Sequence, residues 1–304
     1  MKVDARPGAA GSDMAGDTSD AAVTFRTQPV ESRSVAVPTS DSAAPSPAPS
    51  PSPSDAASTS TLVAEPVTLP GVDQDLRGVL IGPTAGHAAA GPSPVVIVVP
   101  EVDGLTTDTE VAARRIAGAG YTALAVDLYA PLGGVPKLRN PTDTIAFTQR
   151  LNDHRQLSDL SMAIDWLCDR PGVDPQRIAL VGFSAGGRYS LLLSTEPRPV
   201  RAVVTFYTRI WPSEVIGGRP IPPGDHTEQF RAPVCSIFGA QDDVVPAEMV
   251  DRYRRLLSAR PGNEVHLVDG NHLFMNPSRR RYVPGSAERA WAYALDFLAR
   301  HLGP

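Results

Sequence analysis

Two kinds of apolar segment alternate along most of the chain. The first kind is a short, continuous apolar run, and the clearest example is PVVIVVP at residues 94–100. A run of this kind suits a strand that is buried on both faces. The second kind repeats its apolar residues every three or four positions, as residues 107–120 do before they end in glycine. That spacing, closed by a common helix stop, predicts an amphipathic helix.

The predicted elements follow one another in a regular order. A hairpin is expected first, from residues 61–69 and 76–82. Further strands are expected at residues 94–100, 121–129, 177–182, 200–207, 232–240 and 264–268. Helices are expected at residues 107–120, 157–170, 184–194, 246–259 and 286–301. Because strands and helices alternate from residue 94 onward, we predict an α/β fold with a mostly parallel central sheet and helices on both faces. The conformations of the loops at residues 130–150 and 208–230 do not follow from the pattern.

Residues 1–60 differ in composition from the rest of the chain. Pro, Ser and Ala dominate stretches such as SAAPSPAPSPSPSDAASTST, which ends at residue 61. Few of these residues can build a core, so we predict a disordered tail over residues 1–60 and a single domain over residues 61–304. The tail is either a tether or a dispensable extension, and we favour the extension.

Composition and charge limit the kinds of partner that the protein is expected to bind. The chain of 304 residues is 42% hydrophobic, enough for a large core, and its net charge of −5 gives no sign of a nucleic-acid partner. Its first residues lack the continuous apolar segment of a secretory signal, and no apolar run approaches the ~18 residues of a membrane-spanning helix. We therefore expect a cytoplasmic protein without a membrane or nucleic-acid partner, present as a monomer or a weak homo-oligomer.

The sequence carries no convincing motif for a metal or a cofactor. Cys168 and Cys235 lack the spacing of metal ligands, and neither an HExxH motif nor a Walker A loop is present. Gly118, Gly120 and Ala123 match a dinucleotide fingerprint as a string. They end a predicted helix and enter a strand, however, which is the reverse of what a phosphate-binding turn needs. We expect neither a metal nor a cofactor.

The candidate nucleophile is Ser184, in the G-F-S-A-G stretch at residues 182–186. This stretch connects a predicted strand to a predicted helix, and a sharp turn there exposes the serine hydroxyl above the sheet. Small flanking residues let the neighbouring backbone pass close by. The backbone N–H of Ala185, at the start of the helix, is a candidate donor to an oxyanion.

A serine hydroxyl needs a general base, and the base needs an acid to orient it. Of the six histidines, only His272 follows the carboxyl end of a predicted strand in a loop able to reach Ser184. Asp242 and Asp243 follow another strand, and the residues alone do not decide between them. The chain order Ser, Asp, His is the order of α/β-hydrolases.

Two further residues are candidates because of where they follow strands. Glu101 directly follows the buried run at residues 94–100, where a carboxylate is costly unless it is paired or lies in a cleft. The backbone N–H of Val102 would be the second oxyanion donor. Trp211 follows the strand at residues 200–207, where it either lines the acyl pocket or packs in the core.

Five motifs occur in order along residues 61–304, namely VVIVVPEVDGL, DLY, VGFSAGG, FGAQDDVVP and NHLFMNP. Together they resemble the dienelactone hydrolase family of α/β-hydrolases. The resemblance implies the α/β-hydrolase fold. It selects Asp242 over Asp243, because the family pattern G-x-x-D-x-x-V-P falls on residues 239–246. It also implies that Glu101 contacts the resting nucleophile and borders the substrate.

The same motifs add residues to the candidate site and show two departures from the family. Phe183, Phe274 and Asn276 become candidates for substrate contact or for support of the residues that make it. Dienelactone hydrolases have a cysteine where this chain has Ser184, and an arginine where it has Asn276. The resemblance therefore implies a more general esterase or lactonase.

The sequence predicts a metal-free serine hydrolase that cleaves a small carboxylic ester or lactone through an acyl-enzyme. One alternative is an acyltransferase or cyclase that forms the same acyl-enzyme and passes it to an alcohol or amine. The other is a non-catalytic binding protein with the same fold. The full set of Ser184, Asp242 and His272 argues against the second alternative, because a site without catalysis has no need of all three.

Overall fold

The computed structural model describes residues 62–83, 91–212 and 217–303. The predicted tail at residues 1–60 lies outside these residues. The described part contains one eight-stranded sheet, in the order β1-β2-β4-β3-β5-β6-β7-β8. Its strands are β1 (Leu62–Leu69), β2 (Leu76–Pro83), β3 (Ser93–Val99), β4 (Thr122–Asp127), β5 (Val173–Phe183), β6 (Val200–Phe206), β7 (Val234–Gly239) and β8 (Glu264–Val268).

The sheet confirms the predicted fold class. Strand β2 is antiparallel to both β1 and β4, which accounts for the predicted hairpin. All other neighbouring strands are parallel. The carboxyl ends of β3, β5, β6, β7 and β8 therefore lie along one edge of the sheet, which is where such folds place their ligand sites.

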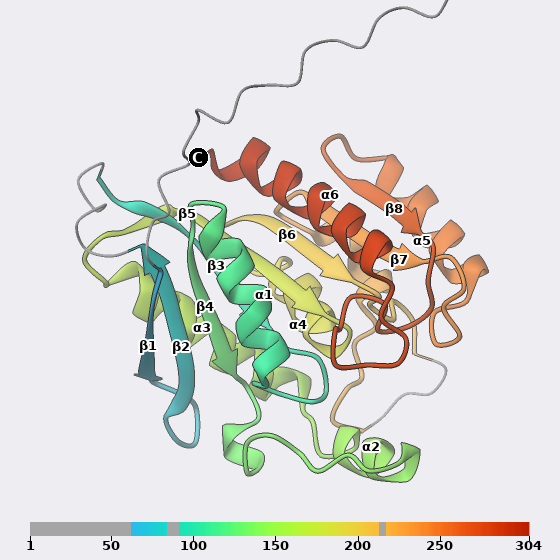
Figure 1. Cartoon of the computed structure of the whole chain (residues 1–304), viewed down its shortest axis with the longest axis horizontal. Helices are drawn as coiled ribbons and strands as arrows, with labels where there is room; N and C mark the ends of the chain where they lie inside the picture. The colour runs from blue at the N-terminus through green and yellow to red at the C-terminus, as the bar shows by residue number, and fades with distance from the viewer. Residues whose placement is uncertain (1–61, 84–90, 213–216, 304) are drawn as a thin grey trace, which may run out of the picture. The chain divides into compact units, whose positions relative to one another are not determined.

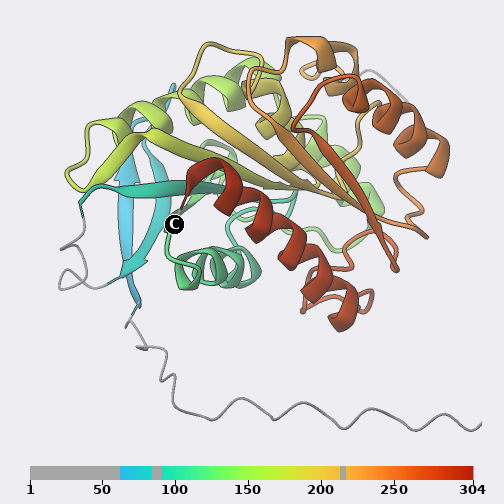
Figure 2. The same cartoon turned by 90° about the horizontal axis from the view of Figure 1, so that it is seen from above.

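Helices cover both faces of the sheet (Figures 1 and 2). Helices α1 (Thr107–Gly118) and α6 (Pro284–Leu302) pack on one face, and α3 (Asp153–Cys168), α4 (Ala185–Leu193) and α5 (Ala247–Ser258) pack on the other. In β3, Val95 and Ile97 belong to the core on the α3 side, while Val96 and Val98 belong to the core on the α1 side. Side chains of a strand point alternately to its two faces, so a continuous apolar run fills both cores.

Three short elements lie in the loops whose conformations did not follow from the pattern. They are η2 (Ala130–Leu132), α2 (Pro141–Thr148) and η3 (Pro223–Gln229). A local signal for α2 is present, because Asn140 accepts a hydrogen bond from the N–H of Asp143 and Pro141 occupies the first helical position. The apolar pattern missed α2 because its only buried residue is Phe147.

Helix α3 begins at Asp153, one turn before the predicted start, so His154 lies within the helix and not before it. Asn152 caps it by accepting a hydrogen bond from the N–H of Arg155. Polar residues occupy three of the four buried positions between residues 153 and 159, namely Asp153, Gln156 and Asp159. A search for apolar periodicity passes over such positions.

Asp153 forms a buried ion pair with Arg188 of α4. The guanidinium donates from Nε to Oδ1 at 2.9 Å and from Nη2 to Oδ2 at 2.6 Å, and both side chains are almost fully buried. Nη2 of Arg188 also donates to the carbonyl oxygen of Ile221 at 2.7 Å. The pair ties α4, the helix that follows Ser184, to α3 and to the loop before η3.

Candidate active site

Ser184 lies between β5 and α4 in a strained turn. Its φ is 46° and its ψ is −108°, in a region that non-glycine residues rarely occupy. A Cβ on Gly186 would lie 2.2 Å from the carbonyl oxygen of Val99, and one on Gly182 would lie 2.5 Å from the Cα of Gly187. Only glycine allows this close passage of the backbone. The glycines that flank Ser184 thus permit the sharp turn that raises its side chain above the sheet.

Ser184, His272 and Asp242 form a continuous chain of contacts at the carboxyl edge of the sheet. The Oγ of Ser184 lies 3.2 Å from Nε2 of His272, and Nδ1 of His272 lies 2.9 Å from Oδ2 of Asp242. The Asp242 side chain is fully buried, and its Oδ1 accepts hydrogen bonds from the N–H groups of Val244 and Val245. A carboxylate held in this way fixes the orientation of the imidazole.

Asp243 points away from this chain of contacts. It forms a bidentate pair with Arg281, at 2.6 and 2.8 Å, and is exposed. Arg279, two residues before Arg281, pairs with Asp103 at 2.5 Å. Both arginines therefore neutralise acids of this chain. The structure brings Asp242, and not its neighbour, to His272.

The two candidate oxyanion donors come from adjacent elements. Ala185 is the first residue of α4, where N–H groups have no acceptor within the helix. Val102 follows β3 in a turn that the N–H of Gly104 closes by donating to the carbonyl oxygen of Glu101. The tight approach of Gly186 to Val99 brings the start of α4 against the end of β3. The residues predicted to hold an oxyanion are thus carried by backbone segments that touch.

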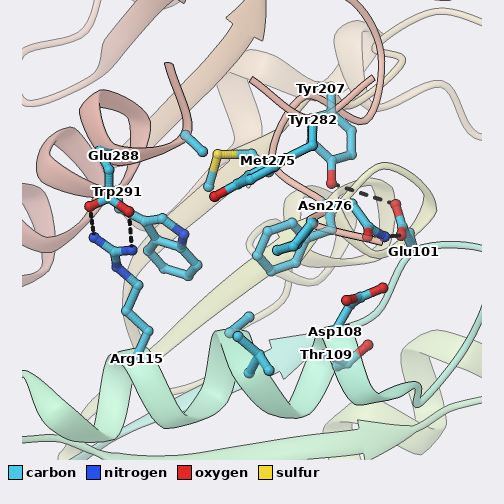
Figure 3. Close-up of a pocket in the computed structure, with 15 residues that line it drawn as sticks. Glu101, Asp108, Thr109, Arg115, Tyr207, Met275, Asn276, Tyr282, Glu288 and Trp291 are labelled. Atoms are coloured by element: carbon cyan, nitrogen blue, oxygen red, sulfur yellow. Dashed lines mark hydrogen bonds and ion pairs between the residues drawn. The ribbon is translucent and has the colours of Figure 1, made fainter. Parts of the chain in front are cut away.

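Glu101 is buried and held by two side chains. Nδ2 of Asn276 donates to its Oε1 at 2.6 Å, and the hydroxyl of Tyr207 lies 3.5 Å from its Oε2 (Figure 3). Burial, followed by repulsion from Asp103, raises the pKa of Glu101 from 4.5 to about 7. The hydrogen bond from Asn276 acts in the opposite direction. Glu101 therefore changes its charge close to neutral pH.

Tyr207 was missed by the sequence analysis. It follows β6 with a φ of 40°, and its ring meets the ring of His272 edge-on at 5.1 Å. Its hydroxyl reaches Glu101, so one side chain contacts both the histidine and the buried glutamate. Its position after a strand, at the carboxyl edge of the sheet, could have indicated a site residue. An aromatic residue at that position is also typical of core packing.

A cavity of about 150 Å³ lies beside these residues, between α1 and α6. Phe183, Asn276, Glu101 and Tyr207 line it, and contact of Phe183 or Asn276 with a substrate stays a prediction. Neither Ser184 nor His272 is among its lining residues. Within the part of the chain that the structure describes, the cavity thus adjoins the chain of contacts without including it.

Trp211 and Phe274 lie outside the lining of this cavity. The indole N–H of Trp211 donates to Asp225 at 2.7 Å, and its ring packs edge-on against Tyr253. These contacts correspond to the packing alternative for Trp211. Phe274 is fully buried and packs edge-on against Tyr207, with ring centroids 5.7 Å apart. A contact of either side chain with a substrate stays a prediction.

Among the residues that the structure describes, one group of side chains has ligand atoms close enough for a metal ion. The atoms of Cys235, Glu264 and His266 lie within 4.8 Å of one another. Their present contacts are structural, because Glu264 pairs with Arg300 at 2.6 Å and the His266 ring stacks on Tyr293. We assign no metal to this group.

The pKa of Glu101 leads to a pH-dependent prediction of stability. The folded protein holds this proton up to about pH 7, whereas the unfolded chain releases it near pH 4.5. The unfolded state therefore binds fewer protons between these values, and stability falls as pH rises through this window. As the pH rises from 4.5 to 8, the free energy of unfolding of Glu101→Gln should increase by about 3 kcal/mol relative to that of wild type. Urea unfolding at several pH values measures this.

The matched control for this prediction is Glu248→Gln, at an exposed position in α5. A parallel stability profile for Glu101→Gln and wild type across the whole pH range would show that Glu101 is not a buried, protonated acid.

The parallel sheet, its two helical layers and the turn at Ser184 define an α/β-hydrolase fold. A solved structure described as that of a putative dienelactone hydrolase from Klebsiella pneumoniae superimposes with a TM-score of 0.72 and 27% identity, covering 79% of this chain and 99% of that one. The profile of the dienelactone hydrolase family matches residues 76–302. The chain belongs to this family and is a hydrolase of ester or lactone bonds.

Two relatives give the extent of the similarity in sequence. A protein of Bradyrhizobium sp. named "Probable 2-oxo-3-(5-oxofuran-2-ylidene)propanoate lactonase" is 30% identical over 220 residues, which are 72% of this chain and 88% of the relative. A protein of Escherichia coli K12 named "Putative carboxymethylenebutenolidase" is 31% identical over 216 residues, 70% of this chain and 79% of the relative.

Among the described residues, no helix has the length and apolar composition needed to cross a bilayer. The expected cytoplasmic location and the expected oligomeric state stay predictions from the sequence.

Proposed function

We propose that this protein hydrolyses a small carboxylic ester or lactone through an acyl-enzyme on Ser184. The observation that carries the proposal is the chain of contacts from Ser184 Oγ to His272 Nε2 and from His272 Nδ1 to Asp242, at 3.2 and 2.9 Å. A base within reach of a hydroxyl, itself held by a buried carboxylate, is the arrangement that activates serine. The lactonase name of the Bradyrhizobium relative supports lactones as one substrate class.

In the first half of the reaction, Ser184 Oγ attacks the carbonyl carbon while Nε2 of His272 takes the hydroxyl proton. The carbonyl oxygen becomes an oxyanion, which the N–H groups of Val102 and Ala185 stabilise. The buried carboxylate of Asp242 stabilises the imidazolium that forms. When the tetrahedral intermediate collapses, the alkoxide leaves with the proton from His272, and the acyl group stays on Ser184. In a lactone this alkoxide remains tethered to the acyl group.

Water completes the cycle. His272 takes a proton from a water molecule that attacks the acyl carbon, and a second oxyanion forms at the same two N–H groups. Its collapse releases the carboxylic acid and returns the proton to Ser184 Oγ. No step calls for a redox change, and the products are an acid and an alcohol, or one hydroxy acid from a lactone.

We expect the protein to hydrolyse p-nitrophenyl butyrate and to lose this activity after labelling by a fluorophosphonate. The probe should form one covalent adduct, on Ser184, because only a serine with a positioned base attacks phosphorus readily. Peptide mapping by mass spectrometry locates the adduct, and heat-denatured protein is the control. Full hydrolysis by labelled protein, or an adduct confined to another residue, would contradict the proposal.

A further inference from the structure

The cavity between α1 and α6 lies beside Ser184, but a role in the reaction at Ser184 does not account for the residues that line it. It is reached by side chains from the turn after β3, from both helices and from the loop after His272. Its middle is apolar, with Phe183, Met275 and Trp291 in the lining. An apolar cavity of about 150 Å³ can hold a single benzene ring. The space therefore suits one ring or a short alkyl chain.

The polar groups of the cavity lie at its two ends (Figure 3). At the outer end, Arg115 of α1 forms a bidentate pair with Glu288 of α6, and its guanidinium lies over Trp291. At the inner end lies Glu101, with Asp108 nearby. The lining thus contains three acids and one arginine, and that arginine is already paired with Glu288. Above about pH 7, where Glu101 is ionised, the lining at the inner end therefore carries an excess of negative charge.

The carboxyl group of Glu101 can still accept further hydrogen bonds. Asn276 donates to Oε1, and Tyr207 approaches Oε2 only at 3.5 Å. A carboxylate has about four acceptor positions on its two oxygens, so these contacts leave some unused. A primary ammonium group offers three donors and a positive charge. Charge and hydrogen bonding at the inner end are thus complementary to an ammonium group.

We propose that this cavity is a second binding site, for a small primary ammonium compound that carries one aromatic ring or a short alkyl chain. The ammonium group pairs with Glu101, and the apolar part lies among Phe183, Met275 and Trp291. The site adjoins the attacking serine without including it, since neither Ser184 nor His272 is among the lining residues in the described part of the chain. Carboxylates are excluded from it by the acids at its inner end.

Binding at this site should depend on pH. The groups that act on Glu101 come from three directions, namely Asp103 and Asp108 near α1, Tyr207 after β6, and Asn276 and Arg279 in the loop after His272. The pKa of Glu101 is raised to about 7, and an ammonium ion favours the ionised carboxylate. Affinity therefore rises from pH 5.5 to pH 8, with release of a proton from Glu101 at the lower pH values.

The test is calorimetric titration of the full chain with 2-phenylethylammonium, phenylacetate and 2-phenylethanol at pH 8. We expect the ammonium compound to bind with a Kd below about 1 mM and at least tenfold more tightly than the alcohol, and phenylacetate to show no heat of binding. Glu101→Gln should weaken binding of the ammonium compound at least tenfold. Ala112→Leu, which adds volume inside the cavity, should weaken all binding, and Glu248→Gln is the matched control.

Three results would overturn the second site. The first is equal affinity for the ammonium compound and phenylacetate. The second is affinity unchanged in both Glu101→Gln and Ala112→Leu when circular dichroism shows folded protein. The third is purely competitive inhibition of p-nitrophenyl butyrate hydrolysis by 2-phenylethylammonium, which would put the compound at Ser184. The titrations need no catalytic activity, so they stand even if the proposed hydrolysis fails.

Discussion

Replacing Ser184 with alanine is expected to lower kcat/KM for p-nitrophenyl butyrate by about 10⁴-fold or more. The variant keeps the N–H groups of Val102 and Ala185, so weak catalysis by oxyanion stabilisation can remain. It loses the atom that bonds to the acyl group, and His272 then has no hydroxyl to deprotonate. Initial rates of p-nitrophenolate release measure the loss.

Two adjacent aspartates provide a matched test of the same chain of contacts. Asp242→Asn removes the charge beside Nδ1 of His272, and a loss of about 10⁴-fold in kcat is expected, as for other enzymes of this type. Asp243→Asn only breaks an exposed pair with Arg281, and the rate should stay within about threefold of wild type.

Ser258→Ala, in the last turn of α5, is the control for Ser184→Ala. Equal rates for Ser184→Ala and wild type would rule out Ser184 as the nucleophile.

Arg188→Met is expected to destabilise the protein by about 3–5 kcal/mol. The variant leaves the carboxylate of Asp153 buried without its partner, and it also removes the donor to the carbonyl oxygen of Ile221. A buried charge that loses its counter-charge bears the full cost of its desolvation. The free energy of unfolding in urea measures the effect, at a pH where wild type unfolds in one transition.

Two further variants separate this effect from the loss of any arginine. Arg139→Met removes an exposed pair with Asp143 and should cost less than about 1 kcal/mol. The double variant Arg188→Met with Asp153→Leu removes both buried charges and should recover part of the stability, because neither charge is then left unpaired. A loss below 1 kcal/mol for Arg188→Met would mean that water reaches Asp153.

The elements that were predicted best are those whose burial requires a recognisable pattern of apolar residues in the sequence. The continuous run at residues 94–100 became β3, because a strand covered by helices on both faces must be apolar throughout. The alternation of strands and helices led directly to the parallel sheet. Helix α2 and the first turn of α3 were missed, because one is largely exposed and the other buries polar groups.

The sequence predicts those residues of the candidate site that lie just after the ends of strands. Residues at the carboxyl ends of parallel strands meet at one edge, so the sequence alone indicates Ser184 and His272. The choice between Asp242 and Asp243 needed the resemblance to a family. In the structure, the fully buried side chain of Asp242 lies against His272, and Asp243 turns outward to Arg281.

The sequence by itself determined the fold class, the strained turn at Ser184 and the order of the candidate residues. These features depend on local patterns, such as glycine at positions where a Cβ would collide with passing backbone. Only the tertiary structure decided the surroundings of Glu101, with Asn276 and Tyr207 as its hydrogen-bonding neighbours and an apolar cavity beside it. Those residues come from separate strands and loops, and their contacts depend on the packing of α1 and α6 against the sheet. No spacing along the chain encodes that packing.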